Sequence, residues 1–287
     1  MSNIIDAIIN LVNYKCNFLL KNSSGNNRAN NSGDGLEEYV KDLFAGTFYT
    51  DGSQRLEKIN EVFSYLGNKS NPPDAMLKGG DAIEVKKIEN PNSALALNSS
   101  YPKNKLFADS SMINQACKTA EKWNCKDIMY IVGHVPKNKS KKAITKLKNL
   151  CIVYGMDYCA EEACYLKIWN TIKQNIESIP SIEFAESREL GHINKVDPLG
   201  ITYMRVRGMW GIENPWKVFD YVYSRTIDKK FSFMCIINNE KWATFANTTS
   251  LIELAATENS LIISDIRIKD PNNPANLRNA KLITFSF

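Results

Sequence analysis

The stretch from Pro73 to Glu89 constrains the fold more than any other part of the sequence. Two short runs of alternating apolar and polar residues lie on either side of Gly79-Gly80. Glycine accepts the positive φ angles that tight turns require, so Lys78-Gly79-Gly80 is suited to be a three-residue connection. The pattern therefore predicts a β-hairpin.

Charged residues occupy one face of this predicted hairpin. Side chains alternate between the two faces of a strand, so Glu84 and Lys86 share one face while Ile83 and Val85 point into the core. Asp74 lies ten residues before Glu84. An odd number of connecting residues places the two carboxylates opposite each other. We therefore expect two carboxylates and an ammonium to meet at one edge of a sheet.

The rest of the chain predicts helices and strands in alternation. Apolar residues at helical spacing predict helices at 1–20, 36–44, 55–66, 112–123, 137–150 and 160–176. Buried strands are expected at 127–135 and 151–154, and a polar loop at 22–35. This order predicts an α/β fold with a mixed central β-sheet flanked by helices.

The pattern changes after about residue 195. Aromatic and β-branched runs predict strands at 201–209, 218–223, 231–237, 261–268 and 282–287. We therefore expect residues 1–195 to form a core and residues 196–287 a strand-rich C-terminal region. Whether that region is a separate lobe stays open.

Composition narrows the chemistry. The chain has only two histidines. His134 ends an apolar run, which favours a structural role, and His192 lacks the partner histidine that a metal site needs. No G-x-S-x-G segment is present, so serine hydrolase chemistry is unsupported. Carboxylates and a lysine must carry any catalysis.

The cysteines and the hydropathy pattern indicate in which cellular compartment the protein is expected. The seven cysteines form no C-x-x-C pair, which favours a reduced compartment without disulfides or a zinc site. No apolar run is long enough to cross a bilayer, and the N-terminus lacks a signal-peptide pattern. We expect a soluble, cytoplasmic protein without membrane contact. The net charge of +5 permits a polyanionic partner.

Asp74, Glu84 and Lys86 suit magnesium-dependent hydrolysis of a phosphodiester. Mg²⁺ prefers hard oxygen ligands and keeps several waters, so the two carboxylates and the Val85 carbonyl are expected as its protein ligands. Lys86 would orient the attacking water or stabilise charge in the transition state.

Three alternatives weaken this interpretation. An ordinary hairpin with charges on its solvent face gives the same pattern. Asp81 could replace Asp74, although its parity places it with the core-facing residues Ile83 and Val85. A second acidic-x-Lys triplet occurs at Asp228-Lys229-Lys230. The Pro73-Asp74 dipeptide, one strand upstream across a turn, distinguishes the first triplet from the second.

The pattern Pro73-Asp74…Glu84-Val85-Lys86 resembles the PD-(D/E)XK nuclease motif. The flanking segments, 33–38 before it and 94–103 after it, resemble those of NgoPII-type Type II restriction endonucleases. The resemblance covers most of the first 200 residues. It implies a PD-(D/E)XK-like catalytic core, a homodimer and Mg²⁺-dependent cutting of double-stranded DNA at GGCC. It also implies 5′-phosphate and 3′-hydroxyl ends and a companion DNA methyltransferase.

Two other functions fit the same motif. A repair or junction-resolving nuclease of this superfamily would read DNA structure rather than sequence. A degenerate, catalytically inactive DNA-binding protein of the same fold is a further alternative, which the intact motif disfavours.

The predicted helix at 36–44 carries adjacent glutamates. Its apolar stripe borders Glu37, whereas Glu38 falls on the opposite side. Many nucleases of this superfamily carry a helix glutamate that reaches the metal, so Glu37 is a candidate catalytic residue. Equally, it could be a half-exposed residue that complements the helix dipole.

Several residues are candidates for DNA contact. Short polar side chains and a lysine follow the catalytic strand and suit phosphates or base edges, namely Asn98, Ser99, Ser100, Tyr101 and Lys103. A plain surface loop would look similar. Arg28, in the polar loop, would close over the DNA backbone.

Arginines offer the best candidates for base recognition. Arg205 and Arg207 share one face of a predicted strand in the C-terminal region, which we expect to carry DNA-recognition and dimer elements. Arginine forks pair with guanine O6 and N7, although salt-bridged surface arginines show the same spacing. The lysines at 137–148 surround a predicted helix and favour a solvated surface over a DNA clamp.

Overall fold

The computed structural model describes residues 2–20, 28–67, 71–137, 144–225 and 228–287. The helices are α1 (Ile4–Tyr14), α2 (Arg28–Ala45), α3 (Gly52–Val62), α4 (Gln115–Thr119), α5 (Gly155–Tyr158), α6 (Glu162–Glu177), α7 (Pro215–Val218), α8 (Asn239–Trp242) and α9 (Thr248–Thr257). In its first half the strands are β1 (Phe18–Leu20), β2 (Phe63–Leu66), β3 (Ala75–Leu77), β4 (Ala82–Ile88), β5 (Leu95–Asn98), β6 (Lys105–Phe107), β7 (Cys125–His134), β8 (Ile144–Lys146) and β9 (Asn149–Tyr154). The second half adds β10 (Glu183–Phe184), β11 (Gly191–Asn194), β12 (Met204–Val206), β13 (Trp210–Ile212), β14 (Ser232–Asn238), β15 (Leu261–Lys269) and β16 (Leu277–Ser286).

A mixed sheet organises the fold. Among the described residues nine strands belong to it, in the order β15-β16-β14-β9-β7-β4-β3-β2, with β6 paired to β7. The pairs β4–β7 and β9–β14 are parallel, and the other neighbours are antiparallel. The sequence-based prediction of an α/β fold with a mixed central sheet flanked by helices is confirmed.

Two apolar layers cover the two faces of this sheet. On one face, strand residues such as Ile83 and Ile131 pack against α1, α2 and α9. On the other, alternate residues such as Tyr130 and Val132 pack against α4, α7 and the β5–β6 segment. Since neighbouring residues on a strand point to opposite faces, both layers need continuous apolar runs along β7, β9 and β14. Those runs are what made the buried strands predictable.

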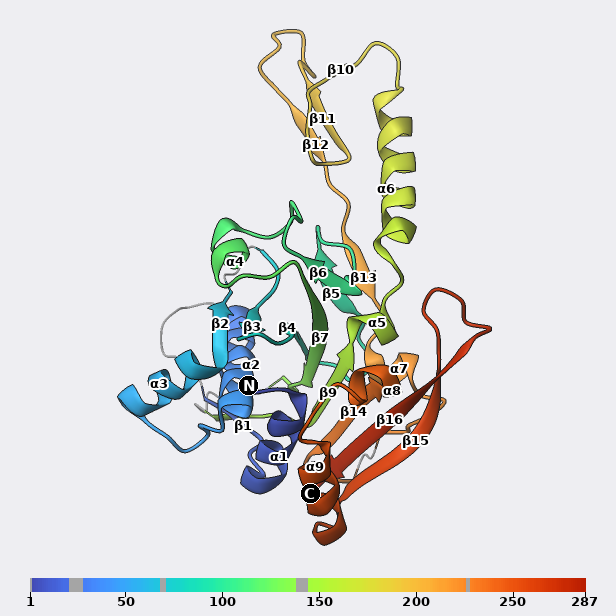
Figure 1. The fold of residues 1–287 in the computed structure, drawn as a ribbon. Helices are drawn as coiled ribbons and strands as arrows, with labels where there is room; N and C mark the ends of the chain where they lie inside the picture. The colour runs from blue at the N-terminus through green and yellow to red at the C-terminus, as the bar shows by residue number, and fades with distance from the viewer. Residues whose placement is uncertain (1, 21–27, 68–70, 138–143, 226–227) are drawn as a thin grey trace.

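An arm projects from this core. Figure 1 shows α6 and the small sheet β10-β11-β12 extending together beyond the central sheet. No residue of α6 is buried, so the arm is thin and largely exposed. At its base, Trp169 of α6 stacks on Trp210 of β13, which pairs with β5 of the core.

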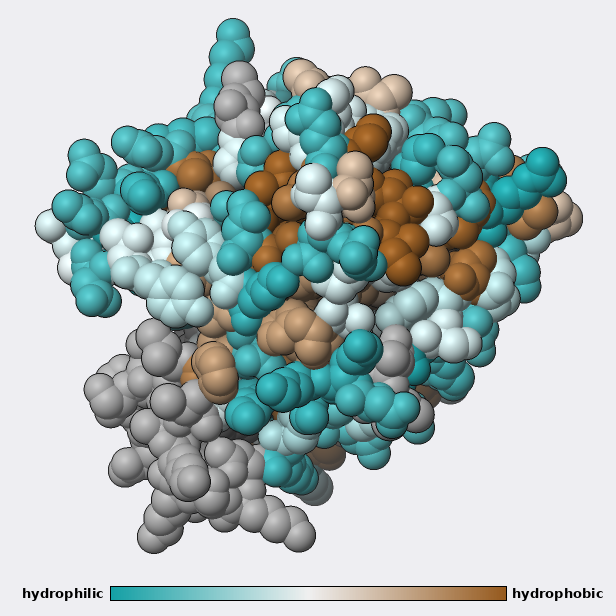
Figure 2. Space-filling model, turned by 90° about the horizontal axis from the view of Figure 1, so that it is seen from below, coloured by the Kyte–Doolittle hydropathy of each residue, from teal (hydrophilic) through white to brown (hydrophobic). Residues whose placement is uncertain are grey.

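The opposite end of the molecule has a mixed surface. Seen from below, hydrophobic side chains gather near the middle of the face, with hydrophilic ones around them (Figure 2). No helix among the described residues has both the length and the apolar character to cross a membrane.

Several predicted elements are wrong in extent or type. Strands β8 and β9 replace the end of the helix expected at 137–150, of which residues 138–143 lie outside the described part. Strand β8 is stabilised by pairing with β1, a partner that lysine-rich composition does not reveal. The loop expected at 22–35 is helical from Arg28 onward, and the helix expected at 55–66 gives way to β2 at Phe63.

Among the remaining predicted helices and strands, some differ from the observed ones in length or type, and four strands agree. Helix α1 is shorter than the predicted 1–20, because Lys15 adopts a left-handed conformation that ends it. The strand expected at 218–223 is wrong: α7 covers Pro215–Val218, with Pro215 in its first turn, where proline is favourable. The strands at 127–135, 231–237, 261–268 and 282–287 are confirmed in β7, β14, β15 and β16.

The C-terminal region shares the central sheet with the first part of the chain. Strand β14 pairs with β9, and β16 and β15 extend the sheet beyond it. A functional division at residue 195 therefore stays a proposal about roles within one continuous sheet.

Candidate active site

The hairpin β3–β4 has the register that the sequence predicts. Ala75 pairs with Ile83, and Leu77 N donates to Asp81 O at 3.0 Å. Lys78-Gly79-Gly80 is thus a three-residue connection, and Gly79 has a φ of 61°. Extending the register by one residue places Asp74 opposite Glu84. The odd connection that this alignment requires is confirmed.

A buried lysine on the neighbouring strand fixes the turn. The Lys126 ammonium on β7 donates to the carbonyl oxygens of Gly80 at 2.5 Å and Leu77 at 3.2 Å. It also forms an ion pair with Glu121, which accepts a hydrogen bond from the Gly79 amide at 2.9 Å. These contacts hold the register, and therefore the position of Asp74 relative to Glu84.

The two carboxylates and Lys86 lie together at the open end of β3. Asp74 Oδ2 accepts a hydrogen bond from the Val85 amide at 2.6 Å, just before β3 begins at Ala75. Glu84 Oε1 lies 2.7 Å from Lys86 Nζ, so both side chains share one face of β4. Glu84 Oε2 is buried and has no hydrogen-bond partner among the residues that the structure describes. A buried carboxylate oxygen without a partner is costly unless a cation occupies the space beside it.

The electrostatics also favour a bound cation. Burial raises the pKa of Asp74 well above its usual range, and the charge of Glu84 raises it further. Burial lowers the pKa of Lys86, but the charges of Glu84 and Asp74 outweigh that effect and raise it overall. Negative charge thus accumulates around one ammonium, and a divalent cation would favour the ionised carboxylates.

The available donors suit a magnesium ion. Asp74, Glu84 and the Val85 carbonyl are hard oxygen ligands, which Mg²⁺ prefers while it keeps several waters. Among the described residues, no group of three or more histidine, cysteine, aspartate or glutamate side chains is arranged to hold a metal. The protein donors therefore fit a metal that takes its remaining ligands from water and substrate.

Asp81 does not belong to this cluster. Its Oδ2 accepts from the Tyr154 hydroxyl at 2.8 Å, and its Oδ1 lies 2.6 Å from Lys241 Nζ. Tyr154 packs in the layer that contains Ile83, so Asp81 lies on the face away from Glu84, as its parity predicts. The second triplet, Asp228-Lys229-Lys230, is an exposed bend.

The adjacent glutamates of α2 have separate surroundings. Glu38 forms ion pairs with Lys41 at 2.6 Å and Arg55 at 2.8 Å. Glu37 lies near enough to the cluster that its charge raises the pKa of Asp74 and of Lys86. The predicted rotation of the helix, with Glu37 toward the site and Glu38 away from it, agrees with this arrangement.

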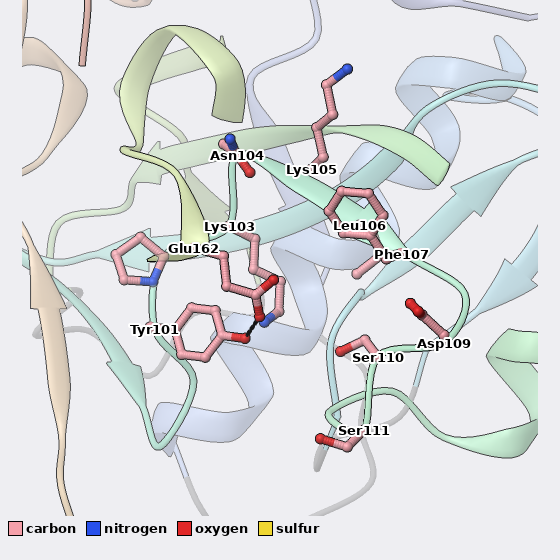
Figure 3. Close-up of a pocket in the computed structure, with 11 residues that line it drawn as sticks. Tyr101, Lys103, Asn104, Lys105, Leu106, Phe107, Asp109, Ser110, Ser111 and Glu162 are labelled. Carbon is pink, nitrogen blue, oxygen red and sulfur yellow. Dashed lines mark hydrogen bonds between the residues drawn. The ribbon is translucent and has the colours of Figure 1, made fainter. Parts of the chain in front are cut away.

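The segment after β4 borders the cluster. A small cavity is lined by Pro72, Glu84, Leu97, Ser100, Tyr101, Lys103, Ile128 and Tyr130. Asn98 ends β5 with a φ of 52°, and both Asn98 and Ser99 are exposed. The Tyr101 hydroxyl hydrogen-bonds Glu162 at the start of α6, as Figure 3 shows. Of the predicted contact residues, Ser100, Tyr101 and Lys103 therefore line the cavity that contains Glu84.

A larger groove lies between the core and the arm. Its walls combine core residues, including Ser99, Ser100 and Tyr101, with arm residues, including Trp169, Glu189 and Arg207. Tyr101 stacks on Tyr165 of α6, with ring centroids 6.0 Å apart. The groove therefore runs from Ser100 and Tyr101, which also line the small cavity that contains Glu84, to Arg207 of the arm.

Arg205 and Arg207 both reach the same carboxylate. Arg205 Nη2 and Arg207 Nε each lie 2.6 Å from Glu189 Oε1. The two guanidinium groups therefore point to one side of the arm, as the spacing predicts, and both side chains remain about half exposed. The structure gives no position for the Arg28 side chain, which lies outside the described part.

Sequence patterns missed several residues of this region. Glu162 and Trp169 of α6 meet Glu189 and Trp210, from two later segments of the chain, in the walls of the groove. The aromatic side chains at the arm base were a usable signal, because exposed helices rarely carry tryptophan without a partner surface.

Comparison with known proteins gives one consistent result. Residues 2–269 match the family described as NgoPII restriction endonuclease. Over 283 residues the chain is 62% identical to the Type II restriction enzyme NgoPII of Neisseria gonorrhoeae, with 99% of each chain covered. No solved structure matches the chain.

Proposed function

The chain belongs to the NgoPII restriction endonuclease family, and we propose that it cuts both strands of GGCC with Mg²⁺ at the Asp74–Glu84–Lys86 cluster. Membership confirms the resemblance noted in the motif segments and establishes a Type II restriction enzyme, a site-specific deoxyribonuclease. The core around β3, β4 and β7 is then a PD-(D/E)XK-type catalytic core. The observation that carries this assignment is the buried Glu84 Oε2, which no described residue hydrogen-bonds.

Each residue of the cluster has a role in hydrolysis. Asp74, Glu84 and the Val85 carbonyl would hold Mg²⁺, which supplies Lewis-acid activation of water and neutralises phosphate charge. Lys86, fixed by its ion pair with Glu84, orients the attacking water and stabilises negative charge on phosphorus. Glu37 orients water or metal from α2. Breaking the bond between phosphorus and O3′ leaves a 5′-phosphate and a 3′-hydroxyl.

The groove is the proposed DNA-binding surface. Asn98, Ser99, Ser100, Tyr101 and Lys103 contact the backbone near the cut, and Arg28 closes over it from α2. Arg205 and Arg207 read guanines in the major groove, because their forks match guanine O6 and N7.

Assembly and context complete the proposal. A palindrome cut on both strands calls for two copies related by a twofold axis, so the protein acts as a homodimer. The C-terminal region contributes recognition and dimer elements. The enzyme works in the cytoplasm, where a companion methyltransferase protects host DNA without forming a stable complex.

A plasmid digest tests the proposal. Purified protein with Mg²⁺ should produce discrete fragments whose sequenced ends share GGCC, and Glu84→Ala or excess chelator should abolish them. Cleavage by Glu84→Ala at the wild-type rate would refute the active site. Discrete fragments with another common sequence would refute only the GGCC assignment.

The alternatives predict different results. A junction-resolving nuclease would cut a four-way junction in preference to a linear duplex that contains GGCC. An inactive DNA-binding protein would retard the duplex in a gel but release no fragments with any divalent metal.

A further inference from the structure

Lys103 stands out among the basic residues near the cluster because it is buried. Its exposed fraction is 7%. The Lys103 amide donates to the Tyr130 hydroxyl at 2.7 Å, and that hydroxyl in turn donates to the Lys103 carbonyl at 3.2 Å. Both backbone groups of Lys103 are therefore tied to β7, and the direction of its side chain is fixed.

Among the described residues the contacts of the Lys103 ammonium are uncharged. It lies 4.2 Å from the centroid of the Tyr101 ring and 3.4 Å from Met112 Sδ. In the part of the chain that the structure describes, no carboxylate forms an ion pair with it. Burial lowers the pKa of Lys103, an effect that the charges of Glu162 and Glu84 partly offset. A buried ammonium that pairs only with a ring and a thioether is expensive to maintain.

The small cavity that Lys103 lines also contains an unpaired negative group. Lys103 and Glu84 both line it, and within the described part of the chain Glu84 Oε2 has no hydrogen-bond partner. One wall therefore requires a cation and the other an anion. The cavity measures about 20 Å³, so a single phosphate oxygen would enter it to face Lys103 while a divalent metal balances Glu84. Either ligand alone leaves one buried charge unpaired.

We propose that Lys103 is a second catalytic cation, whose ammonium contacts a non-bridging oxygen of the scissile phosphate and stabilises the charge that develops there during hydrolysis. This inference rests on the proposed function. The water oxygen forms the new bond to phosphorus and loses a proton to solvent. The P–O3′ bond breaks with its electron pair on O3′, which takes a proton from solvent, and Lys103 remains protonated throughout.

Burial distinguishes Lys103 from a lysine that only attracts the DNA backbone. Its side chain lies beside Tyr101 and Glu162, which are joined by a hydrogen bond (Figure 3). A lysine that only attracts DNA gains most from being exposed, because counterion release depends on contact with phosphates along the duplex. Burial beside Glu84 instead favours one phosphate, the one at the cluster.

Lys103→Met distinguishes a catalytic lysine from one that only binds DNA, because methionine fills similar space without a charge. With GGCC duplex at saturation and Mg²⁺ present, single-turnover cleavage should fall by about 100-fold or more. The duplex dissociation constant, measured by anisotropy without divalent metal, should change by less than about threefold. Lys122→Met, which removes an exposed charge after α4, should leave both quantities near wild type.

Three outcomes would overturn the assignment. Cleavage by Lys103→Met within about threefold of wild type would do so. So would weaker binding with an unchanged rate at saturation, since that result describes a binding residue. If Lys103→Met does not fold, Lys103→Ala is assayed with propylammonium, which should restore cleavage. Failure of rescue in a folded Lys103→Ala protein that binds DNA would count against a catalytic ammonium.

A parallel assay of Glu84→Ala tests the proposed active site separately from the role of Lys103. If Glu84→Ala is inactive while Lys103→Met cuts normally, only the role of Lys103 is wrong. If Glu84→Ala itself cuts normally, the proposed active site is wrong and the Lys103 result has another cause.

Discussion

Two adjacent glutamates on α2 illustrate how much depends on single residues. Glu38 is held on the surface by Lys41 and Arg55, and the pKa of its carboxyl is lowered overall although burial opposes the two cations. Glu37 faces the cluster closely enough to affect the pKa of Asp74. One step along the helix, about 100°, therefore separates a surface ion pair from a candidate water- or metal-orienting group.

Conservative changes to the two glutamates should have unequal effects. Glu37→Gln removes charge beside the cluster without removing a hydrogen-bonding group, and should slow single-turnover cleavage by about tenfold or more. Glu38→Gln removes charge from a surface network and should leave the rate within about twofold of wild type. Raising the Mg²⁺ concentration should partly restore the first variant. Equal effects from both changes would show that Glu37 does not act on the site.

The residues of the candidate active site could be predicted from sequence where local rules decide. Period-two alternation and the turn glycines fix the alignment of Asp74 with Glu84, and parity alone sends Asp81 to the other face. Lys103 was predicted only as a DNA contact, because its burial depends on β7 and on Tyr130. Glu189 was missed, since nothing nearby in sequence marks it as the shared partner of two arginines.

At the scale of elements, the hairpin depends on a residue outside it. Lys126 is 6% exposed and its ammonium is bound by two carbonyls of the turn and by Glu121. Because these acceptors are partly or fully buried, removing the ammonium leaves them without a donor, at a cost of about 1–3 kcal/mol. The turn would then lose the restraint that keeps Asp74 in register.

Lys126→Met should therefore impair stability and activity together. The midpoint of thermal unfolding should fall by several degrees, since about 1 kcal/mol corresponds to roughly 2–4 °C for a chain of this size. Cleavage should fall even at temperatures where the variant is folded, because Asp74 is misaligned. Glu121→Gln keeps an acceptor for the Gly79 amide and should have a smaller effect on both measurements. An unchanged midpoint for Lys126→Met would contradict the restraint.

The elements that sequence failed to predict share a physical cause. Strand β8 exists because β1 supplies a partner from the far end of the chain. The first turns of α2 contain asparagine, serine and glycine, which disfavour helices, but they precede the strongly apolar stripe that begins at Leu36. Long apolar runs such as β7 are predictable since two buried faces demand them, whereas short edge strands depend on distant partners.

At the scale of the whole molecule, the arm connects the proposed recognition strand to the core segment that borders Glu84. Trp169 and Trp210 fasten α6 to β13, and β13 pairs with β5 just before the loop that borders Glu84. A continuous series of contacts therefore connects α6 with the loop that borders Glu84. The sequence predicted strands in this region but not their projection from the core, because an exposed helix and a small sheet carry the same local patterns as packed ones.

The shared contact with Glu189 makes Arg205 and Arg207 a testable pair. Without DNA, one carboxylate holds both guanidinium groups toward the same side of the arm, which reduces the cost of ordering them when two neighbouring guanines are read. Arg205→Ala and Arg207→Ala should each weaken binding to a GGCC duplex by about 1–3 kcal/mol relative to a scrambled duplex at matched salt. Lys173→Met, on the wall of the same groove, should instead weaken both duplexes alike and reduce the salt dependence by about one ion. Competition binding over a range of salt concentrations, with both duplexes and all three variants, separates these behaviours. If the arginine variants weaken both duplexes equally, the pair holds the phosphate backbone and the bases are read elsewhere in the groove.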